Sequence, residues 1–150
     1  MKRIYLDNAA TTPVRPEVVE AMNIAFTTEY GNPSSMYEEG ESAKALLVEA
    51  RERIASCLNA KQNEIYFTSC GSESDNWAIK GTALQYGNTK KRIIISSIEH
   101  HAIINTCDSL AKQGFEIIKL PVDEYGIVSP ADVEHAINDN TLIVSIMYAN

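Results

Sequence analysis

Short apolar runs that alternate with helix-like segments constrain the fold of this chain more than any other feature. The runs at residues 93–95 and 142–144 are apolar without interruption, which is typical of strands that are covered on both faces. From residue 64 onward, the predicted order of elements is β-α-β-α-β-α-β. This order predicts an α/β fold with a three-layer α-β-α arrangement around a mainly parallel sheet.

Local periodicity, with Gly and Pro residues as end signals, places the individual elements. Strands are predicted at residues 4–6, 64–68, 93–97, 115–120 and 142–147. Helices are predicted at residues 16–30, 38–58, 103–113 and 131–137, and a further helix follows the loop at 69–72 and ends near Gly87. Ser72, with Asp75 three residues further on, is predicted to cap that helix, and Ser129 is predicted to cap the last one.

The charge balance argues against two classes of partner. The chain of 150 residues carries 13 Lys and Arg against 20 Asp and Glu, which gives a formal net charge of −7. Binding to nucleic acid or to an anionic membrane surface requires clustered basic residues, and the sequence contains no basic stripe. We therefore expect neither nucleic acid nor membrane as a partner. The length and the 45% hydrophobic content allow one globular domain, which need not be complete.

The termini and the cysteines point to a cytoplasmic protein. The apolar run after Met1 is too short for a signal peptide, and no later run has the length of a membrane span. Cys57, Cys70 and Cys107 are odd in number and lack a C-x-x-C spacing, so neither a disulfide framework nor a zinc site is indicated. We expect all three thiols to be reduced.

A phosphate site is one interpretation of the small polar loop at residues 69–72. In an open α/β sheet, ligands bind beyond the carboxyl ends of the strands, where this loop and the loops at 97–101 and 148–150 are expected. Backbone N–H groups at a helix start, with the hydroxyls of Ser69 and Ser72, suit a single phosphate. A nucleotide is disfavoured because the Walker lysine and the full glycine fingerprint are missing. The alternative is a helix cap without a ligand.

His100 is the second candidate residue. It follows Glu99 directly after an apolar strand, which is a catalytic position in this architecture. The alternative is an ordinary polar loop residue. A metal site is disfavoured, because the adjacent side chains of His100 and His101 point in different directions and no H-E-x-x-H spacing is present.

Several ordered motifs resemble one family, the pyridoxal-phosphate-dependent cysteine desulfurases within class V of the aminotransferases. The motifs, spread over essentially the whole chain, are Tyr5-Leu6-Asp7-Asn8-Ala9-Ala10-Thr11-Thr12, Gly31-Asn32-Pro33-Ser34-Ser35, Phe67-Thr68-Ser69-Cys70-Gly71-Ser72-Glu73-Ser74-Asp75-Asn76, Glu99-His100-His101-Ala102 and Val144-Ser145-Ile146-Met147. The combination of motifs, in this order and spacing, is more specific than any one of them.

The resemblance implies a fold, an activity and roles for three residues. Residues 1–150 would be the N-terminal part of the large domain of a fold type I pyridoxal-phosphate enzyme. Gly71 and Ser72 would hold the phosphate of pyridoxal 5'-phosphate, and His100 would stack on its ring and assist proton transfer. The complete enzyme would convert L-cysteine to L-alanine and pass the sulfur on as a persulfide, for iron-sulfur cluster or thio-cofactor synthesis. A homodimer and a sulfur-acceptor or scaffold protein are also implied.

The sequence departs from the family pattern in three ways. Cys70 stands where the family usually has Gly, Tyr37 where many members have His, and Ser72 where Thr is usual. Asn150 matches the first residue of the family's Asn-Asn-Glu turn, so the residues that bond the cofactor covalently and accept the sulfur are expected beyond it. In this family a lysine bonds the cofactor covalently. Neither Lys80 nor Lys119 stands in the sequence context that the family has around that lysine.

We therefore expect the 150-residue chain to be inactive on its own. Two alternatives remain open. One is a related class V enzyme, such as a selenocysteine lyase or an aminotransferase, and the other is a non-catalytic binding or dimerisation module.

Overall fold

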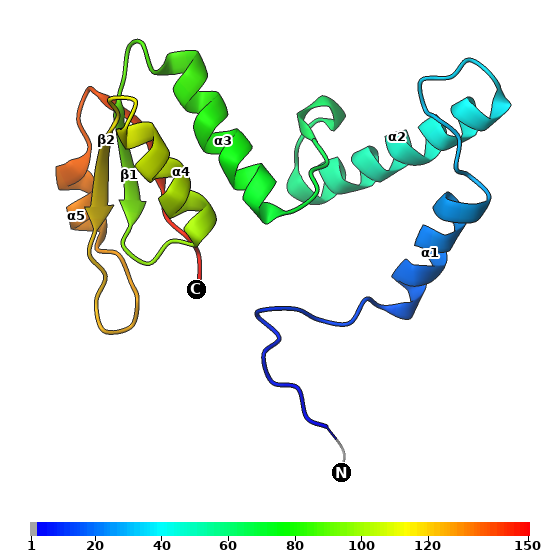
Figure 1. Cartoon of the computed structure of the whole chain (residues 1–150), viewed down its shortest axis with the longest axis horizontal. Coiled ribbons are helices and arrows are strands. Elements are labelled where there is room, and N and C mark those ends of the chain that lie inside the picture. Colours follow the sequence, from blue (N-terminus) through cyan, green and yellow to red (C-terminus); the bar gives the residue numbers. More distant parts are fainter. Residues whose placement is uncertain (1–2) are drawn as a thin grey trace. The chain divides into compact units, whose positions relative to one another are not determined.

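The computed structural model describes residues 3–150, and the chain divides into two compact units (Figure 1). Unit 1 is Met1–Tyr66 and unit 2 is Phe67–Asn150. Among the described residues, none of the helices combines the length and the apolar composition that crossing a bilayer requires. The assignment of residues 1–150 to one large domain stays a prediction.

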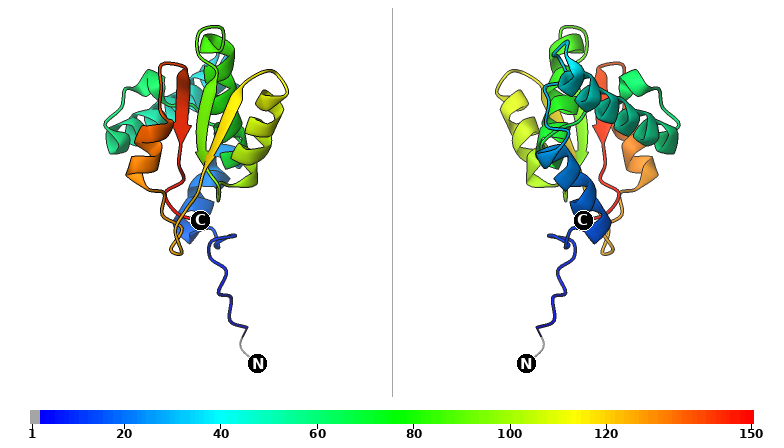
Figure 2. Two further views of the ribbon diagram at one scale, coloured as in Figure 1. Left: turned by 90° about the vertical axis from the view of Figure 1, so that its left-hand side faces the viewer. Right: turned by 90° about the vertical axis from the view of Figure 1, so that its right-hand side faces the viewer.

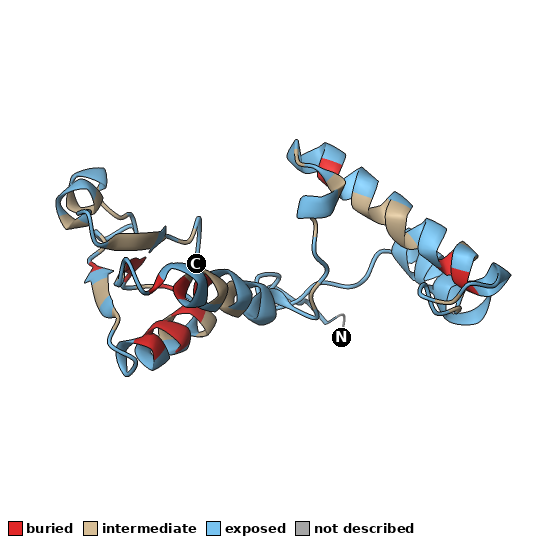
Figure 3. Ribbon diagram, turned by 90° about the horizontal axis from the view of Figure 1, so that it is seen from above, coloured by how far each residue is buried: buried red, intermediate tan, exposed pale blue. Residues whose placement is uncertain are grey.

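Unit 1 is helical. It contains α1 (Pro16–Thr27), α2 (Glu38–Leu58) and the short 3-10 helix η1 (Gln62–Glu64). Helix α2 has the predicted bounds and ends at Asn59, which adopts the left-handed conformation, as is common where a helix terminates. Few side chains of the unit are buried, and α1 has none (Figure 3). The apolar side chains of α1 therefore remain available for packing.

A tight turn precedes α2 and requires glycine at two positions. A Cβ atom on Gly31 would lie 2.0 Å from the carbonyl oxygen of Glu39, and one on Gly40 would lie 2.5 Å from that of Ser35. Any larger residue would force the backbone apart. The turn at residues 31–35 is thus packed directly against the first turn of α2.

Two predicted strands are wrong. Residues 4–6 and 64–68 form no strand, and all strands assigned within residues 3–150 belong to unit 2. Ile4 and Leu6 are 77% and 85% exposed. A strand needs a neighbouring strand to satisfy its backbone N–H and C=O groups. Among residues 3–150 neither segment pairs with another strand, so the alternating pattern by itself did not produce a strand.

Unit 2 contains the predicted alternation. Its elements, in chain order, are α3 (Gly71–Tyr86), β1 (Arg92–Ser96), α4 (His101–Ala111), β2 (Glu116–Leu120), α5 (Pro130–Ala136) and β3 (Thr141–Ser145). The strand order is β2-β1-β3, and both pairings of the central strand β1 are parallel (Figure 2). The Ser129 side chain caps α5 as predicted, since its hydroxyl oxygen accepts a hydrogen bond from the Asp132 N–H.

The sheet of unit 2 is covered on both faces. Helices α3 and α4 lie on one face and α5 lies on the other (Figure 1). This arrangement confirms the predicted three-layer α/β fold, here with a three-stranded sheet. The fully buried residues Ile93, Ile94 and Ile95 of β1 explain it, because successive side chains of a strand point to opposite faces.

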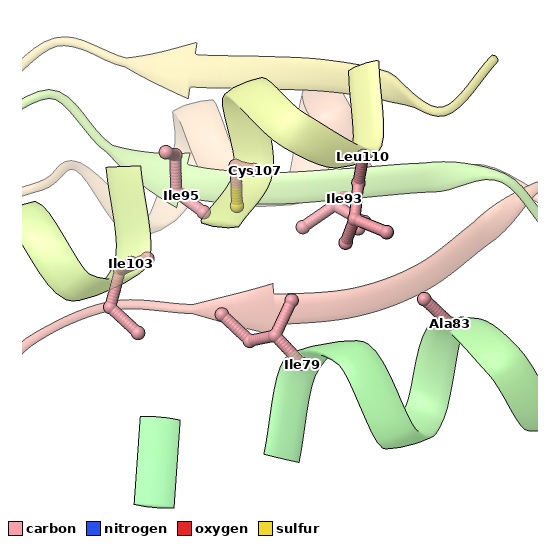
Figure 4. Packing of buried hydrophobic residues seen from close by; sticks show 7 residues of the cluster. All are labelled: Ile79, Ala83, Ile93, Ile95, Ile103, Cys107 and Leu110. Carbon is pink, nitrogen blue, oxygen red and sulfur yellow. The ribbon is translucent and has the colours of Figure 1, made fainter. Parts of the chain in front are cut away.

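The hydrophobic core lies between β1 and the pair of helices α3 and α4 (Figure 4). Its buried members are Ile79, Ala83, Ile93, Ile95, Ile103, Cys107 and Leu110. At the amino end of β1, the guanidinium of Arg92 donates to both carboxyl oxygens of Glu116 at 2.8 Å and to the carbonyl oxygen of Ala136 at 2.9 Å. The core and this ion pair together hold β1 in place from its amino end onward. They therefore also determine where its carboxyl end lies.

Candidate functional site

The candidate residues gather at one end of unit 2. Helices α3 and α4 both begin at the end of the sheet where β1 finishes (Figure 1). Gly71 and Ser72 are the first two residues of α3, and His100 is the N-cap residue of α4. All three residues are exposed. The structure thus places the loops at 69–72 and 97–101 at the same end of unit 2 (Figure 1), as expected for an α/β sheet.

The start of α3 has two backbone donors that make no hydrogen bond to an oxygen atom of the described residues. The first helical hydrogen bond runs from the Ser74 N–H to the Cys70 carbonyl oxygen at 3.2 Å. Within residues 3–150, no oxygen atom accepts from the N–H groups of Gly71 and Ser72. No heavy atom lies within 4 Å of the position that a Cβ of Gly71 would occupy. These open amides at the positive end of a helix dipole fit a phosphate group.

The predicted cap at Ser72 is wrong, because the helix begins earlier than the Ser72–Asp75 spacing indicated. The N-cap residue is Cys70. One carboxyl oxygen of Glu73 accepts from the Ser69 N–H at 2.6 Å and from the Ser69 hydroxyl at 2.8 Å. These two bonds lower the pKa of Glu73.

Ser69 is therefore occupied within the loop. The sequence predicted that its hydroxyl binds a phosphate, but in the structure that hydroxyl donates to the Glu73 carboxylate. Sequence reasoning missed Glu73, although an acid in the first turn of a helix commonly reaches back to the preceding loop. What remains for an anion is the Gly71 N–H, the Ser72 hydroxyl and the Ser72 N–H, which also bonds the Cys70 thiol.

Cys70 lies at the same helix start. Backbone hydrogen bonding from Glu73, the Ser69 hydroxyl and the Ser72 N–H lower the pKa of the Cys70 thiol, as expected for a thiolate near a helix N-terminus. The Ser69 Oγ and Cys70 Sγ atoms are 3.8 Å apart. Because the family usually has Gly here, this thiol is an addition to the loop. Its deprotonated form would repel an anion and compete with it for the same N–H groups.

We predict that Cys70 is alkylated by iodoacetamide at a lower pH than cysteine in an unfolded control peptide, since only the thiolate reacts. Cys107 should stay unlabelled in the folded chain, because burial raises its pKa to about 11. Mass spectrometry of peptides labelled across a pH series measures both. Ser69→Ala should move the Cys70 midpoint upward. Equal midpoints for Cys70 and the control peptide would contradict the prediction.

His100 is held by its own helix. Its Nδ1 atom accepts a hydrogen bond from the Ala102 N–H at 3.1 Å, so a neutral His100 carries its proton on Nε2. The rings of His100 and His101 are 6.3 Å apart and tilted by 59°. Among residues 3–150, no three His, Cys, Asp or Glu side chains are grouped as ligands for a metal ion.

A partly buried hydrogen bond joins the helices that carry the two candidate groups. The Thr106 hydroxyl on α4 donates to Asn76 Oδ1 on α3 at 2.7 Å, and Asn76 Nδ2 donates to the Ser72 carbonyl oxygen at 2.8 Å. Thr106 is buried. The first turn of α3 is thus tied to α4 through two bonds that no sequence motif indicated.

The third predicted loop also reaches this end of the sheet. Asn150 Nδ2 donates to the Ile98 carbonyl oxygen at 2.9 Å, and the Met147 N–H donates to Glu99 Oε1 at 2.7 Å. The segment after β3 therefore lies against the loop that leads to His100. Loops from the carboxyl ends of neighbouring parallel strands, a helix start and an imidazole make this an α/β protein of the class in which a phosphate-bearing ligand would be expected at this end of the sheet.

Comparison with known proteins identifies the family. Residues 4–150 match the profile described as Aminotransferase class-V, and the chain belongs to this family. It is 56% identical over 149 residues to "Cysteine desulfurase IscS" of Methanosarcina thermophila, which covers 99% of this chain and 37% of that protein. The "Cysteine desulfurase IscS" of Clostridium botulinum strain Hall is 52% identical over 151 residues, with 38% of its length covered.

Solved structures agree with these relatives. A "NIFS-LIKE PROTEIN" superposes with a TM-score of 0.96 at 40% identity, over 99% of this chain and 41% of that one. "SspA in complex with cysteine" gives a TM-score of 0.89 at 42% identity, over 95% of this chain and 41% of that one. The resemblance drawn from the sequence motifs is thereby confirmed. The chain spans about two fifths of the length of these relatives.

The residues present fit the cofactor of the family. Class V aminotransferases and cysteine desulfurases depend on pyridoxal phosphate. The donor set at the start of α3, with the open amides of Gly71 and Ser72 and no side chain over Gly71, suits a phosphate monoester. The exposed imidazole of His100 suits a planar ring.

Proposed function

We propose that this chain is the N-terminal part of the cofactor-binding domain of a cysteine desulfurase. The complete enzyme would convert L-cysteine to L-alanine and pass the sulfur on as a persulfide. The observation that carries the proposal is the 56% identity to a cysteine desulfurase over 99% of the chain. The Gly71 and Ser72 amides at the start of α3, which have no oxygen acceptor among the described residues, and the position of His100 at the start of α4 support it.

The phosphate would be bound by backbone and hydroxyl groups. In this proposal the N–H groups of Gly71 and Ser72 and the Ser72 hydroxyl donate to the phosphate oxygens, and the dipole of the 16-residue helix α3 favours the charge. The bonds from Asn76 to Ser72 and from Thr106 to Asn76 hold this turn in place. Cys70 makes the site less favourable for an anion than a glycine would, because its thiolate competes for the same amides.

His100 would orient the cofactor ring and move protons. Pyridoxal phosphate, when bound, supplies an electron sink for bonds at the α-carbon of an amino acid. Because Nδ1 of His100 accepts from Ala102, its Nε2 atom is the one that can donate or hold a proton towards the ligand. The hydrogen bond also fixes the orientation of the imidazole, so a proton would be transferred at a defined position.

Substrate, assembly and location belong to the same proposal. A similar structure is described as being in complex with cysteine, which supports L-cysteine as the substrate. The apolar residues of α1 are exposed, Phe26 at 69% among them, and this favours packing against further protein, such as the rest of the enzyme in a homodimer. We also propose a cytoplasmic location, a sulfur-acceptor or scaffold protein as partner, and a role in iron-sulfur cluster or thio-cofactor synthesis.

The 150-residue chain remains predicted to be inactive by itself. Lys80 is an exposed residue of α3, and the Lys119 ammonium donates to Asp108 at 3.2 Å. Neither lysine is placed at the starts of α3 and α4, where the cofactor is proposed to bind. The activity is therefore proposed only for the complete protein.

Turnover by the complete protein tests the proposal. We expect alanine and sulfide from L-cysteine in the presence of a thiol reductant, with alanine and sulfide formed in equal amounts. Selenocysteine should react less efficiently, and an amino acid with a keto acid should give no transamination. A preference for selenocysteine would indicate the lyase, and amino transfer would indicate the aminotransferase. A complete protein that binds no pyridoxal phosphate would favour the non-catalytic module.

A further inference from the structure

A buried carboxyl group joins two loops of the candidate site and has no part in the function proposed above. Glu99 is only 6% exposed. Its Oε1 atom accepts from the Ser96 hydroxyl and from the Met147 N–H, in each case at 2.7 Å. Ser96 is the last residue of β1, and Met147 follows β3. One oxygen atom therefore links the carboxyl ends of two neighbouring strands.

A second hydrogen bond links the same two segments. Asn150 Nδ2 donates to the Ile98 carbonyl oxygen at 2.9 Å. The segment 147–150 is therefore attached to the β1–α4 loop at two successive residues, Ile98 and Glu99. His100 is the next residue along the chain and caps α4. A displacement of Glu99 would be transmitted directly to the backbone of His100.

The two donors depend on the carboxyl group. Both Ser96 and Met147 line a cavity of about 390 Å³ at this end of the sheet. Without Glu99 they would lose their only acceptor among the described residues, and water entering the cavity would compete for them. A loop held by buried bonds is more rigid than one whose polar groups exchange with water.

We infer that Glu99 is a positioning residue, which fixes the β1–α4 loop on segment 147–150 and so sets the location of the His100 imidazole. The purpose of this positioning, alignment of the ring with the cofactor, rests on the proposed function. The link from Glu99 to the position of His100 does not rest on the proposed function. It can be tested on the 150-residue chain without any cofactor.

The test measures two groups by NMR in the 15N-labelled chain, the Met147 amide and the ring nitrogens of His100. Three variants are compared: Glu99→Ala, Glu99→Asp and Glu99→Gln. Glu134→Ala is the control, since Glu134 is an exposed acid on α5. Glu99→Asp keeps the carboxyl group but shortens its reach, so it tests the position of the oxygen even where Glu99→Ala fails to fold.

In Glu99→Ala and Glu99→Asp, we expect Met147 amide exchange to be about tenfold faster than in the unsubstituted chain, because the amide loses its acceptor. The His100 ring should change from one tautomer, with the proton on Nε2, to a mixture of both. Glu99→Gln should keep both signals near their original values, since its side-chain oxygen can accept the same two bonds. The amides of Ile93 and Ile95 should exchange as before in Glu99→Asp.

Two results would overturn the inference. One is an unchanged His100 ring in Glu99→Asp. The other is an equal acceleration of exchange at Met147, Ile93 and Ile95, since a uniform change would show that Glu99 contributes only to global stability. Neither readout involves turnover, so an inactive complete protein would contradict the proposed function and leave the positioning result standing.

Discussion

His100→Ala in the complete protein is expected to lower the turnover of L-cysteine by roughly 10²- to 10⁴-fold, the range that positioned acid-base groups contribute. The variant removes the imidazole that is proposed to carry protons at Nε2 and to orient the cofactor ring. It also removes the acceptor for the Ala102 N–H at the start of α4. Steady-state kinetics and the absorbance of bound cofactor measure the effect on rate and on binding separately.

Two control variants separate catalysis from helix capping. Asn is a good N-cap residue, so His100→Asn should restore the stability of α4 while leaving the turnover as low as in His100→Ala. His101→Ala removes the neighbouring imidazole, whose ring is tilted by 59° relative to that of His100, and should keep nearly full activity. If His100→Asn were active and His101→Ala were not, the roles assigned to the two histidines would be wrong.

Ile95→Ala is expected to lower the free energy of unfolding of unit 2 by about 2–5 kcal/mol, the range for removing a large aliphatic side chain from a core. Ile95 is 0% exposed and belongs to the cluster between β1 and the helices α3 and α4 (Figure 4). The truncation leaves a cavity next to residues that the strand and both helices hold in place. For a domain with a total stability of roughly 5–15 kcal/mol, such a loss is a large fraction.

Urea denaturation followed by tryptophan fluorescence measures this loss, since Trp77 on α3 is the only tryptophan of the chain. Leu84→Ala is the matched control. Leu84 lies on helix α3, which contributes to the same core, but its side chain is 81% exposed. Its truncation should therefore change the stability by less than about 0.5 kcal/mol. Equal effects of Ile95→Ala and Leu84→Ala would show that the cluster is not the core of unit 2.

Local signals in the sequence predicted most of unit 2. Apolar runs located β1, β2 and β3, and Ser129 as a predicted cap located the start of α5. The same reasoning was wrong for residues 64–68, where the alternation of side chains is local but the pairing partner is not. It was also wrong for the cap at Ser72, because the carboxyl group of Glu73 reaches Ser69 and the N-cap residue is Cys70, two residues earlier.

The motifs around Gly71, Ser72 and His100 predicted where the candidate site lies, and the match of residues 4–150 to the class V family confirms the resemblance. The roles of these residues stay predictions. No motif indicated the bond from Thr106 to Asn76 or the bond from Met147 to Glu99, whose partners are 30 and 48 residues apart in the chain. Side chains at such separations meet only after the sheet has formed.

The sequence by itself determined the family, the alternation of strands and helices in unit 2 and the residues that stand at the starts of α3 and α4, because these follow from local periodicity and ordered motifs. The tertiary structure decided which alternating segment became a strand, which serine was left free at the start of α3, and how Glu99 joins two loops. Those outcomes depend on hydrogen-bond partners that are distant in sequence. A backbone segment that lacks such a partner does not form a strand, even where its side chains alternate.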